Sequence, residues 1–150
     1  MHLKTIHRAA LGVSAALLMG SVALAADAPA RFDGKWMTTM ECPSKGRTEG
    51  YKIQLPSVVT DSNFRGERGA AGQPGYLLIV GKIEKSGKAK LEANGKVSSR
   101  KYATGITTTE GDDYSYKVNA QFEETKGTGV RDAGLGIIGR ACTFDFVKQP

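Results

Sequence analysis

The sequence predicts an all-β protein, a small antiparallel β-barrel of about eight strands whose first and last strands are joined by a disulfide. Short runs of alternating apolar and polar residues recur between glycine-containing turns, which is typical of antiparallel strands. No apolar stripe with the 3.6-residue spacing of a helix follows residue 31. Two cysteines, Cys42 and Cys142, lie near the two ends of this region. A sandwich of two sheets is the alternative arrangement for strands this short.

The first 26 residues are expected to form a cleavable secretory signal peptide. Lys4 and Arg8 give a positive start, an apolar run of about sixteen residues follows, and Ala25 and Ala26 supply the small residues of a cleavage site. An N-terminal membrane anchor is the alternative, although a membrane span needs about 20 apolar residues. The predicted organisation is therefore a signal peptide at 1–26, a linker at 27–31 and one barrel domain at 32–150.

The composition that follows the signal peptide limits the function classes. Basic side chains number 19 and acidic ones 15, a mild excess of about +4 that is spread along the chain. Nucleic-acid binding would need a denser basic stripe. Both histidines, His2 and His7, lie in the signal peptide, so a Ser-His-Asp triad, a Cys-His pair and the commonest zinc ligand are absent from the mature chain. We therefore expect no catalytic residue, no metal and no cofactor.

The expected export places the two cysteines in an oxidising compartment. An even pair of cysteines in a periplasmic or secreted protein is most simply one disulfide, here Cys42–Cys142. A free redox thiol is the alternative, but no C-x-x-C partner is present. No later stretch is long and apolar enough to span a bilayer, so no transmembrane segment is expected after cleavage.

Alternation and turn residues predict the strands one by one. The turn signals are the loop at 66–75, Asn94-Gly95 and Glu110-Gly111-Asp112. The clearest alternation is at 113–124, where Tyr114 and Tyr116 share one face with Phe122. The expected strands cover about 35–42, 50–59, 63–67, 76–84, 88–93, 97–104, 113–124, 127–131 and 138–147.

The ends of the chain favour the barrel over the sandwich. If Cys42 lies opposite Cys142 in an antiparallel pair, Met40 falls opposite Phe144 and Thr38 opposite Phe146. One register then places the disulfide and the large apolar groups on a single inner face. Pairing of the first strand with the last is what closure of a barrel requires.

The motif FDGKW at 32–36 resembles the start of calycin-type barrels, the lipocalins and avidins. In that family a tryptophan after Gly-x closes one end of the barrel, and this role is implied for Trp36. No residue matching a biotin contact is present, so biotin binding is not implied. The chain also resembles small exported bacterial β-barrel proteins of uncharacterised function. That resemblance rests on GERG and GQPGYL at 66–77, GTG at 127–129 and RACTF at 140–144, and it implies export and a barrel without implying a substrate.

Several constellations that suggest catalysis have simpler explanations. The pairs Asp112-Asp113 and Glu123-Glu124 are adjacent in sequence, so their side chains point to opposite faces of a strand and do not form an acid–base dyad. A hydrolase that uses carboxylates alone is a minor alternative. The glycine-rich segments GERGAAGQPG and GLGIIG do not fit a phosphate-binding loop and no helix follows them.

Aromatic and basic residues supply the candidate binding site. The candidates are Tyr114 and Tyr116 for the barrel interior or one mouth, Trp36 for the opposite end, and Arg65 and Arg68 beside the 66–75 loop. Arg140 is expected near a rim, as are Arg65 and Arg68. Core packing is the alternative role of the aromatic residues. The sequence thus predicts an exported non-catalytic binding module that takes a small molecule at a barrel mouth. The alternative is a protein–protein interaction module, such as an inhibitor of an extracellular enzyme or an envelope factor.

Overall fold

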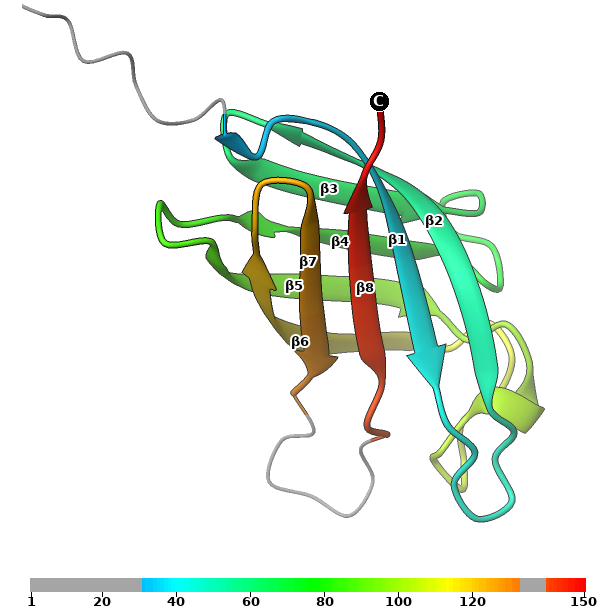
Figure 1. The fold of residues 1–150 in the computed structure, drawn as a ribbon. Coiled ribbons are helices and arrows are strands. Elements are labelled where there is room, and N and C mark those ends of the chain that lie inside the picture. The colour runs from blue at the N-terminus through cyan, green and yellow to red at the C-terminus, as the bar shows by residue number, and fades with distance from the viewer. Residues whose placement is uncertain (1–30, 133–139) are drawn as a thin grey trace, which may run out of the picture.

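A computed structural model describes residues 31–132 and 140–150, which form a closed antiparallel β-barrel of eight strands (Figure 1). Each strand pairs with its neighbours in chain order, and β8 returns to pair with β1. The strands are β1 (Gly34–Cys42), β2 (Tyr51–Thr60), β3 (Asn63–Arg68), β4 (Leu77–Lys82), β5 (Lys88–Lys96), β6 (Asp113–Phe122), β7 (Lys126–Arg131) and β8 (Thr143–Lys148). The predicted fold class is confirmed. The expected signal peptide, most of the linker and the start of the last expected strand lie outside the described residues.

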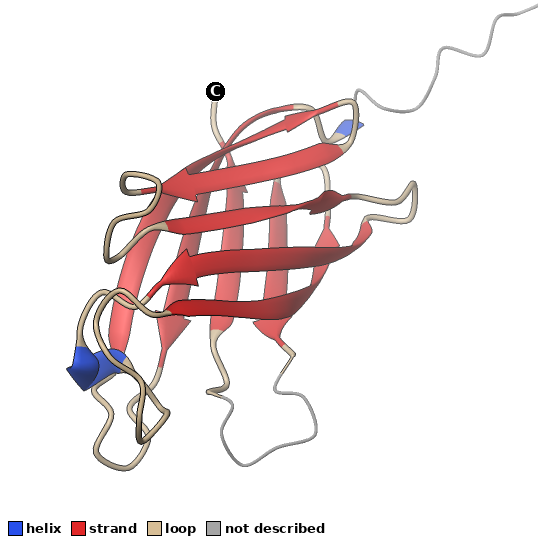
Figure 2. Ribbon diagram, turned by 180° about the vertical axis from the view of Figure 1, so that it is seen from behind, coloured by secondary structure: helices blue, strands red, loops and turns tan. Residues whose placement is uncertain are grey.

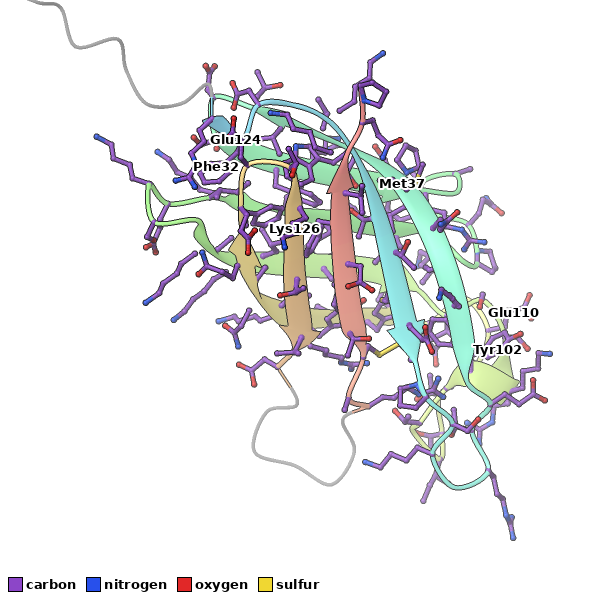
Figure 3. All side chains as sticks on the ribbon, viewed as in Figure 1. Phe32, Met37, Tyr102, Glu110, Glu124 and Lys126 are labelled. Atoms are coloured by element: carbon purple, nitrogen blue, oxygen red, sulfur yellow. A yellow bond between two sulfur atoms is a disulfide. The ribbon has the colours of Figure 1, made fainter. Side chains whose placement is uncertain are left out.

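The seam between β1 and β8 has the predicted register. Met40 lies opposite Phe144 and Thr38 opposite Phe146. The disulfide Cys42–Cys142 lies next to this paired segment and links two residues that are 100 positions apart in the sequence (Figure 3, yellow bond). Both cysteines are buried with the core, so the covalent bond and the apolar interior share one face.

One expected strand and one expected turn are wrong. Residues 97–104 do not form a strand; they contain a short 3-10 helix, η2 (Arg100–Tyr102), within a loop. The guanidinium of Arg100 donates hydrogen bonds to the carbonyls of Gly105, Ile106 and Thr108, and these bonds stabilise a compact loop in place of a ladder. Because 97–104 is a loop, the barrel has eight strands.

The expected Asn94-Gly95 turn lies inside β5, which continues to Lys96. Gly95 pairs with Tyr114, and a Cβ atom at Gly95 would lie 2.5 Å from the Tyr114 hydroxyl. Glycine is therefore required at this position because the Tyr114 side chain packs closely against it, and not because the chain turns there. The expected 66–75 loop also starts later, since residues 66–68 belong to β3.

Aromatic side chains fill the end of the barrel where β1 begins. Trp36 is 1% exposed, and its indole N–H donates to the Phe32 carbonyl at 2.8 Å. The Phe122 ring meets Trp36 edge-on at 5.5 Å and Phe146 at 4.7 Å between centroids. Figure 3 labels Phe32 at this end and Tyr102 at the other. The first end is thus a packed core.

Candidate functional site

A cavity of about 370 Å³ opens at the end of the barrel where β1 finishes. Met40 and Leu77 provide apolar parts of its lining, and residues of the 97–108 loop contribute polar parts. Figure 2 shows this loop and the short helix gathered at one end of the strands. The opposite end is packed with aromatic rings, so one end of the barrel is filled by side chains and the other end holds a cavity.

Contacts to the β1–β2 connection hold the loop beside the cavity. Glu49 forms an ion pair with Lys101 at 3.1 Å, and its backbone N–H donates to the Lys101 carbonyl. The Thr48 hydroxyl donates to the Ala103 carbonyl at 3.1 Å. The edge of the cavity is therefore built from two segments about fifty residues apart in sequence, which brings Tyr102 next to Tyr51.

Four tyrosines line the cavity. Tyr51 and Tyr102 meet edge to face at 5.3 Å, and Tyr114 and Tyr116 lie nearly parallel at 5.9 Å on one face of β6. The Tyr116 hydroxyl donates to the sulfur of Met40 at 3.2 Å. Burial raises the pKa of Tyr114 to about 12 and raises the pKa of Tyr51 and Tyr116 as well. All three buried phenols therefore remain neutral near pH 7.

Two arginines lie against these rings. The Cζ atom of Arg131, at the end of β7, lies 4.3 Å from the centroid of the Tyr116 ring. The Cζ atom of Arg140 lies 5.2 Å from the Tyr51 centroid, and its Nη2 donates to the Tyr102 carbonyl at 3.3 Å. Arg140 is only 2% exposed. Burial, the larger cause, and the nearby Arg131 charge both lower the pKa of its guanidinium.

Neither guanidinium is fully hydrogen-bonded. The Nε atom of Arg131 and the Nη1 atom of Arg140 are buried and have no hydrogen-bond partner among residues 31–132 and 140–150. No ion pair joins either arginine to a carboxylate among residues 31–132 and 140–150. Asp113, the one acidic residue in the described lining, is already paired with Lys96 at 2.8 Å. The cavity is therefore positively charged and has spare hydrogen-bond donors.

The structure brings together three of the five predicted site residues. Tyr114, Tyr116 and Arg68 line the cavity. Trp36 lies in the packed end of the barrel. Arg65 is exposed and pairs with Glu67 at 2.6 Å, away from the cavity lining.

Sequence reasoning missed Tyr51, Tyr102 and Arg131 as site residues. Both Tyr51 and Arg131 had a signal in the sequence: alternation in the expected strand at 50–59 puts Tyr51 on the same side as Ile53 and Leu55, and Arg131 ends the expected strand at 127–131. Tyr102 lay in the segment wrongly assigned to a strand, and its place follows from the loop contacts to Thr48 and Glu49.

The described ranges contain neither a cluster of metal-binding side chains nor a helix that could span a membrane. There, no three His, Cys, Asp or Glu side chains gather in a way that would hold a metal ion. Over the same part of the chain, no helix has the length and apolarity to cross a membrane.

Comparisons with known proteins give no further assignment. A scan of protein-family models, a search of curated proteins and a search of solved structures each found no match to this chain.

Proposed function

We propose that this chain is an exported, non-catalytic binding module that takes up a small molecule in the mouth of its barrel. The observation that carries this proposal is the asymmetry of the interior. One end is packed with aromatic rings around Trp36, whereas the other end holds a cavity of about 370 Å³. Small barrels are either filled by side chains or hold one small ligand, and this barrel combines a filled half with an open half.

The size and lining of the cavity support a small ligand. Ligand sites in proteins are typically concave, about 300–1,000 Å³ in volume, and lined by apolar and aromatic groups with a few placed polar ones. The tyrosines, Met40 and Leu77 supply the apolar surface, and Arg68 and Arg131 supply charged donors. The cavity lies at the small end of that size range.

Export of the module is supported by two features. Residues 1–26 have the order of a secretory signal, and a buried disulfide is compatible with an oxidising compartment. The Gly-x-Trp start, with Trp36 in the closed end, also supports the resemblance to calycin-type barrels. In the proposal, the protein acts in the periplasm or outside the cell.

Native mass spectrometry of protein purified from its own cell envelope tests the proposal. Ile53 lines the cavity, and its neighbour Gln54 is exposed on the outer wall of the same strand. Ile53→Trp adds bulk to the cavity, and Gln54→Trp is the matched control. We expect the wild type and Gln54→Trp to carry a bound small molecule that Ile53→Trp lacks. An empty wild type, or equal occupancy of all three proteins, contradicts the proposal.

A protein–protein interaction module is the second candidate, favoured by one exposed side chain. Ile106 is 91% exposed and lies in the loop that borders the cavity. A partner that covered this side chain would remove its apolar surface from water, which is favourable. The same envelope preparation distinguishes the candidates, because recovery of one stoichiometric protein, lost in Ile106→Ser, favours the interaction module.

A further inference from the structure

We propose that the ligand of this cavity is a small carboxylic acid with an aromatic or apolar body, and that Arg131 and Arg140 bind its carboxylate. This inference rests on the proposed function, since it names the class of molecule that the barrel mouth takes up.

Buried donors without partners point to a missing acceptor. Buried polar groups in proteins are nearly always hydrogen-bonded, and a buried donor left unpaired costs about 1–3 kcal/mol, more if it is charged. Here two such donors, Arg131 Nε and Arg140 Nη1, belong to side chains that contact the tyrosines of one cavity. Arg131 is itself a lining residue, whereas Arg140 contacts the lining residues Tyr51 and Tyr102. An anion seated against these side chains would supply acceptors to both guanidinium groups.

The charge of the two arginines is also uncompensated. No described carboxylate pairs with either of them, and residues 133–139, AGLGIIG, contain no acidic side chain that could do so. The raised pKa values of Tyr51 and Tyr114 mean that the neighbouring phenols do not supply a negative charge near pH 7. A buried charge needs a counter-ion, so the ligand itself is expected to be negative.

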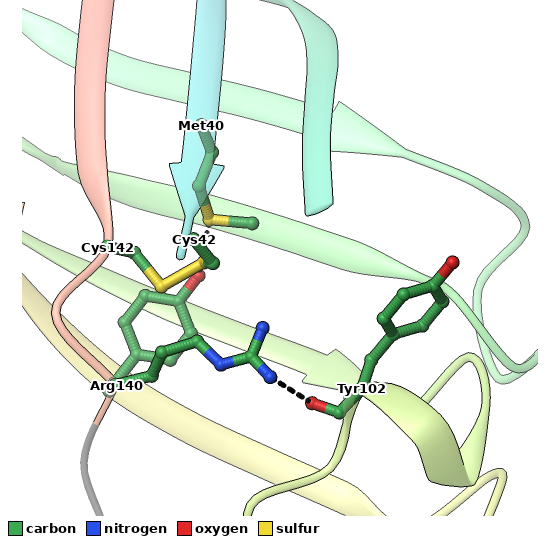
Figure 4. The surroundings of a disulfide bond; sticks show 6 residues. Met40, Cys42, Tyr102, Arg140 and Cys142 are labelled. Atoms are coloured by element: carbon green, nitrogen blue, oxygen red, sulfur yellow. Dashed lines mark hydrogen bonds between the residues drawn. A yellow bond between two sulfur atoms is a disulfide. The ribbon is translucent and has the colours of Figure 1, made fainter. Parts of the chain in front are cut away.

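The backbone fixes both arginines close to the disulfide. The N–H of Arg131 donates to the Cys142 carbonyl at 2.9 Å, and the N–H of Cys142 donates to the Arg140 carbonyl at 3.0 Å. Figure 4 shows the Arg140 guanidinium reaching past the disulfide toward the Tyr102 carbonyl. These bonds beside the disulfide therefore fix the backbone from which both guanidinium groups extend before any ligand arrives, which reduces the entropy cost of binding.

The remaining lining selects the rest of the ligand. A carboxylate fits the planar guanidinium group, which donates in a fork. Beside it lie the Tyr114 and Tyr116 rings, the Met40 thioether and Leu77. This surface suits an apolar or aromatic body, and a bare inorganic anion would leave it unfilled.

Isothermal titration calorimetry with two matched probes tests the inference. The probes are 2-naphthoate and 2-naphthamide, which share a ring system and differ in charge, added to the disulfide-bonded mature chain. We expect the acid to bind roughly tenfold or more tightly than the amide, the scale of one or two hydrogen bonds to a charged group. Arg131→Gln and Arg140→Gln are expected to remove this preference while changing amide binding by less than about twofold.

Arg65→Gln is the matched control, because Arg65 is exposed and outside the cavity lining; it is expected to leave both affinities unchanged. If Arg140→Gln fails to fold, Arg131→Gln alone decides, since Arg131 is only partly buried.

Equal binding of both probes by the wild type, with loss of both in Ile53→Trp, overturns the ligand class and leaves the proposed function standing. Equal weakening of both probes by the arginine variants assigns the arginines a structural role and also overturns the inference. Binding of neither probe overturns it too, and the envelope experiment then judges the proposed function separately.

Discussion

Reduction of the Cys42–Cys142 disulfide should strongly destabilise the barrel. The bond joins two residues that are 100 positions apart, so it closes a long loop in the unfolded chain. Opening the bond raises the conformational entropy of the unfolded state. The chain-entropy treatment gives about 4.7 kcal/mol for a loop of this length. At roughly 4 °C per kcal/mol for a domain of this size, the melting temperature should fall by about 15–20 °C.

The assay is thermal unfolding followed by circular dichroism, with and without reductant. Mass spectrometry after thiol alkylation must show that the reductant has opened the bond, because both sulfur atoms are buried. The control is the double variant Cys42→Ala/Cys142→Ala, which lacks the bond in both conditions and should unfold at one midpoint. An unchanged midpoint in fully reduced wild type would refute the loop-entropy argument.

The same experiment bears on the candidate site. Cys142 is hydrogen-bonded through its backbone to both Arg131 and Arg140, so opening the bond removes a restraint on the two guanidinium groups. We expect the reduced protein, at a temperature where it is still folded, to lose affinity for 2-naphthoate. Unchanged affinity would show that strand pairing alone positions the arginines.

Two further predictions follow from the packing of the tyrosines. Gly95→Ala should destabilise the protein by about 1–3 kcal/mol in urea unfolding, because its Cβ would lie 2.5 Å from the Tyr76 carbonyl oxygen and the Tyr114 hydroxyl; Asn94→Ala, on the exposed face, should have little effect. The free energy of unfolding should also fall as the pH rises from about 10 to about 12. Burial raises the pKa of Tyr114 to about 12 in the folded protein, so this phenol loses its proton at lower pH in the unfolded chain than in the folded one. A flat urea midpoint across that range contradicts the burial of the phenols.

The barrel could be predicted from the sequence because its signals are local and repeated. Alternation in β6 placed Tyr114, Tyr116 and Phe122 on one face, and the parity of the cysteines with Met40 and Phe144 gave the seam register that the structure has. A register error of one residue would have moved every inward side chain outward. The disulfide therefore served as an internal check on the strand assignment.

The candidate site was harder to predict, because alternation tells which face a side chain is on and not how far along the barrel it lies. Trp36 and Tyr116 both point inward, yet one belongs to the packed end and the other to the cavity. Arg140 falls inside the expected strand at 138–147, but this expectation is wrong at 140–142, because β8 begins only at Thr143 and the alternation of a strand does not apply to Arg140. Its burial depends on tertiary contacts with Tyr51 and Tyr102.

The two ends of the barrel use different inward side chains, and this difference has an energetic meaning. Phenylalanines pack the closed end, and β7 makes room for them with glycine, since Gly127 pairs with both Phe122 and Phe146. At the open end tyrosines and Arg131 take the inward positions, and two buried donors, Arg131 Nε and Arg140 Nη1, lack hydrogen-bond partners among the described residues. Apolar side chains of similar volume would avoid the cost of those donors. Folding alone therefore does not account for Arg131 and Arg140, whereas an anion that binds to the folded barrel would offset their cost each time it occupies the site.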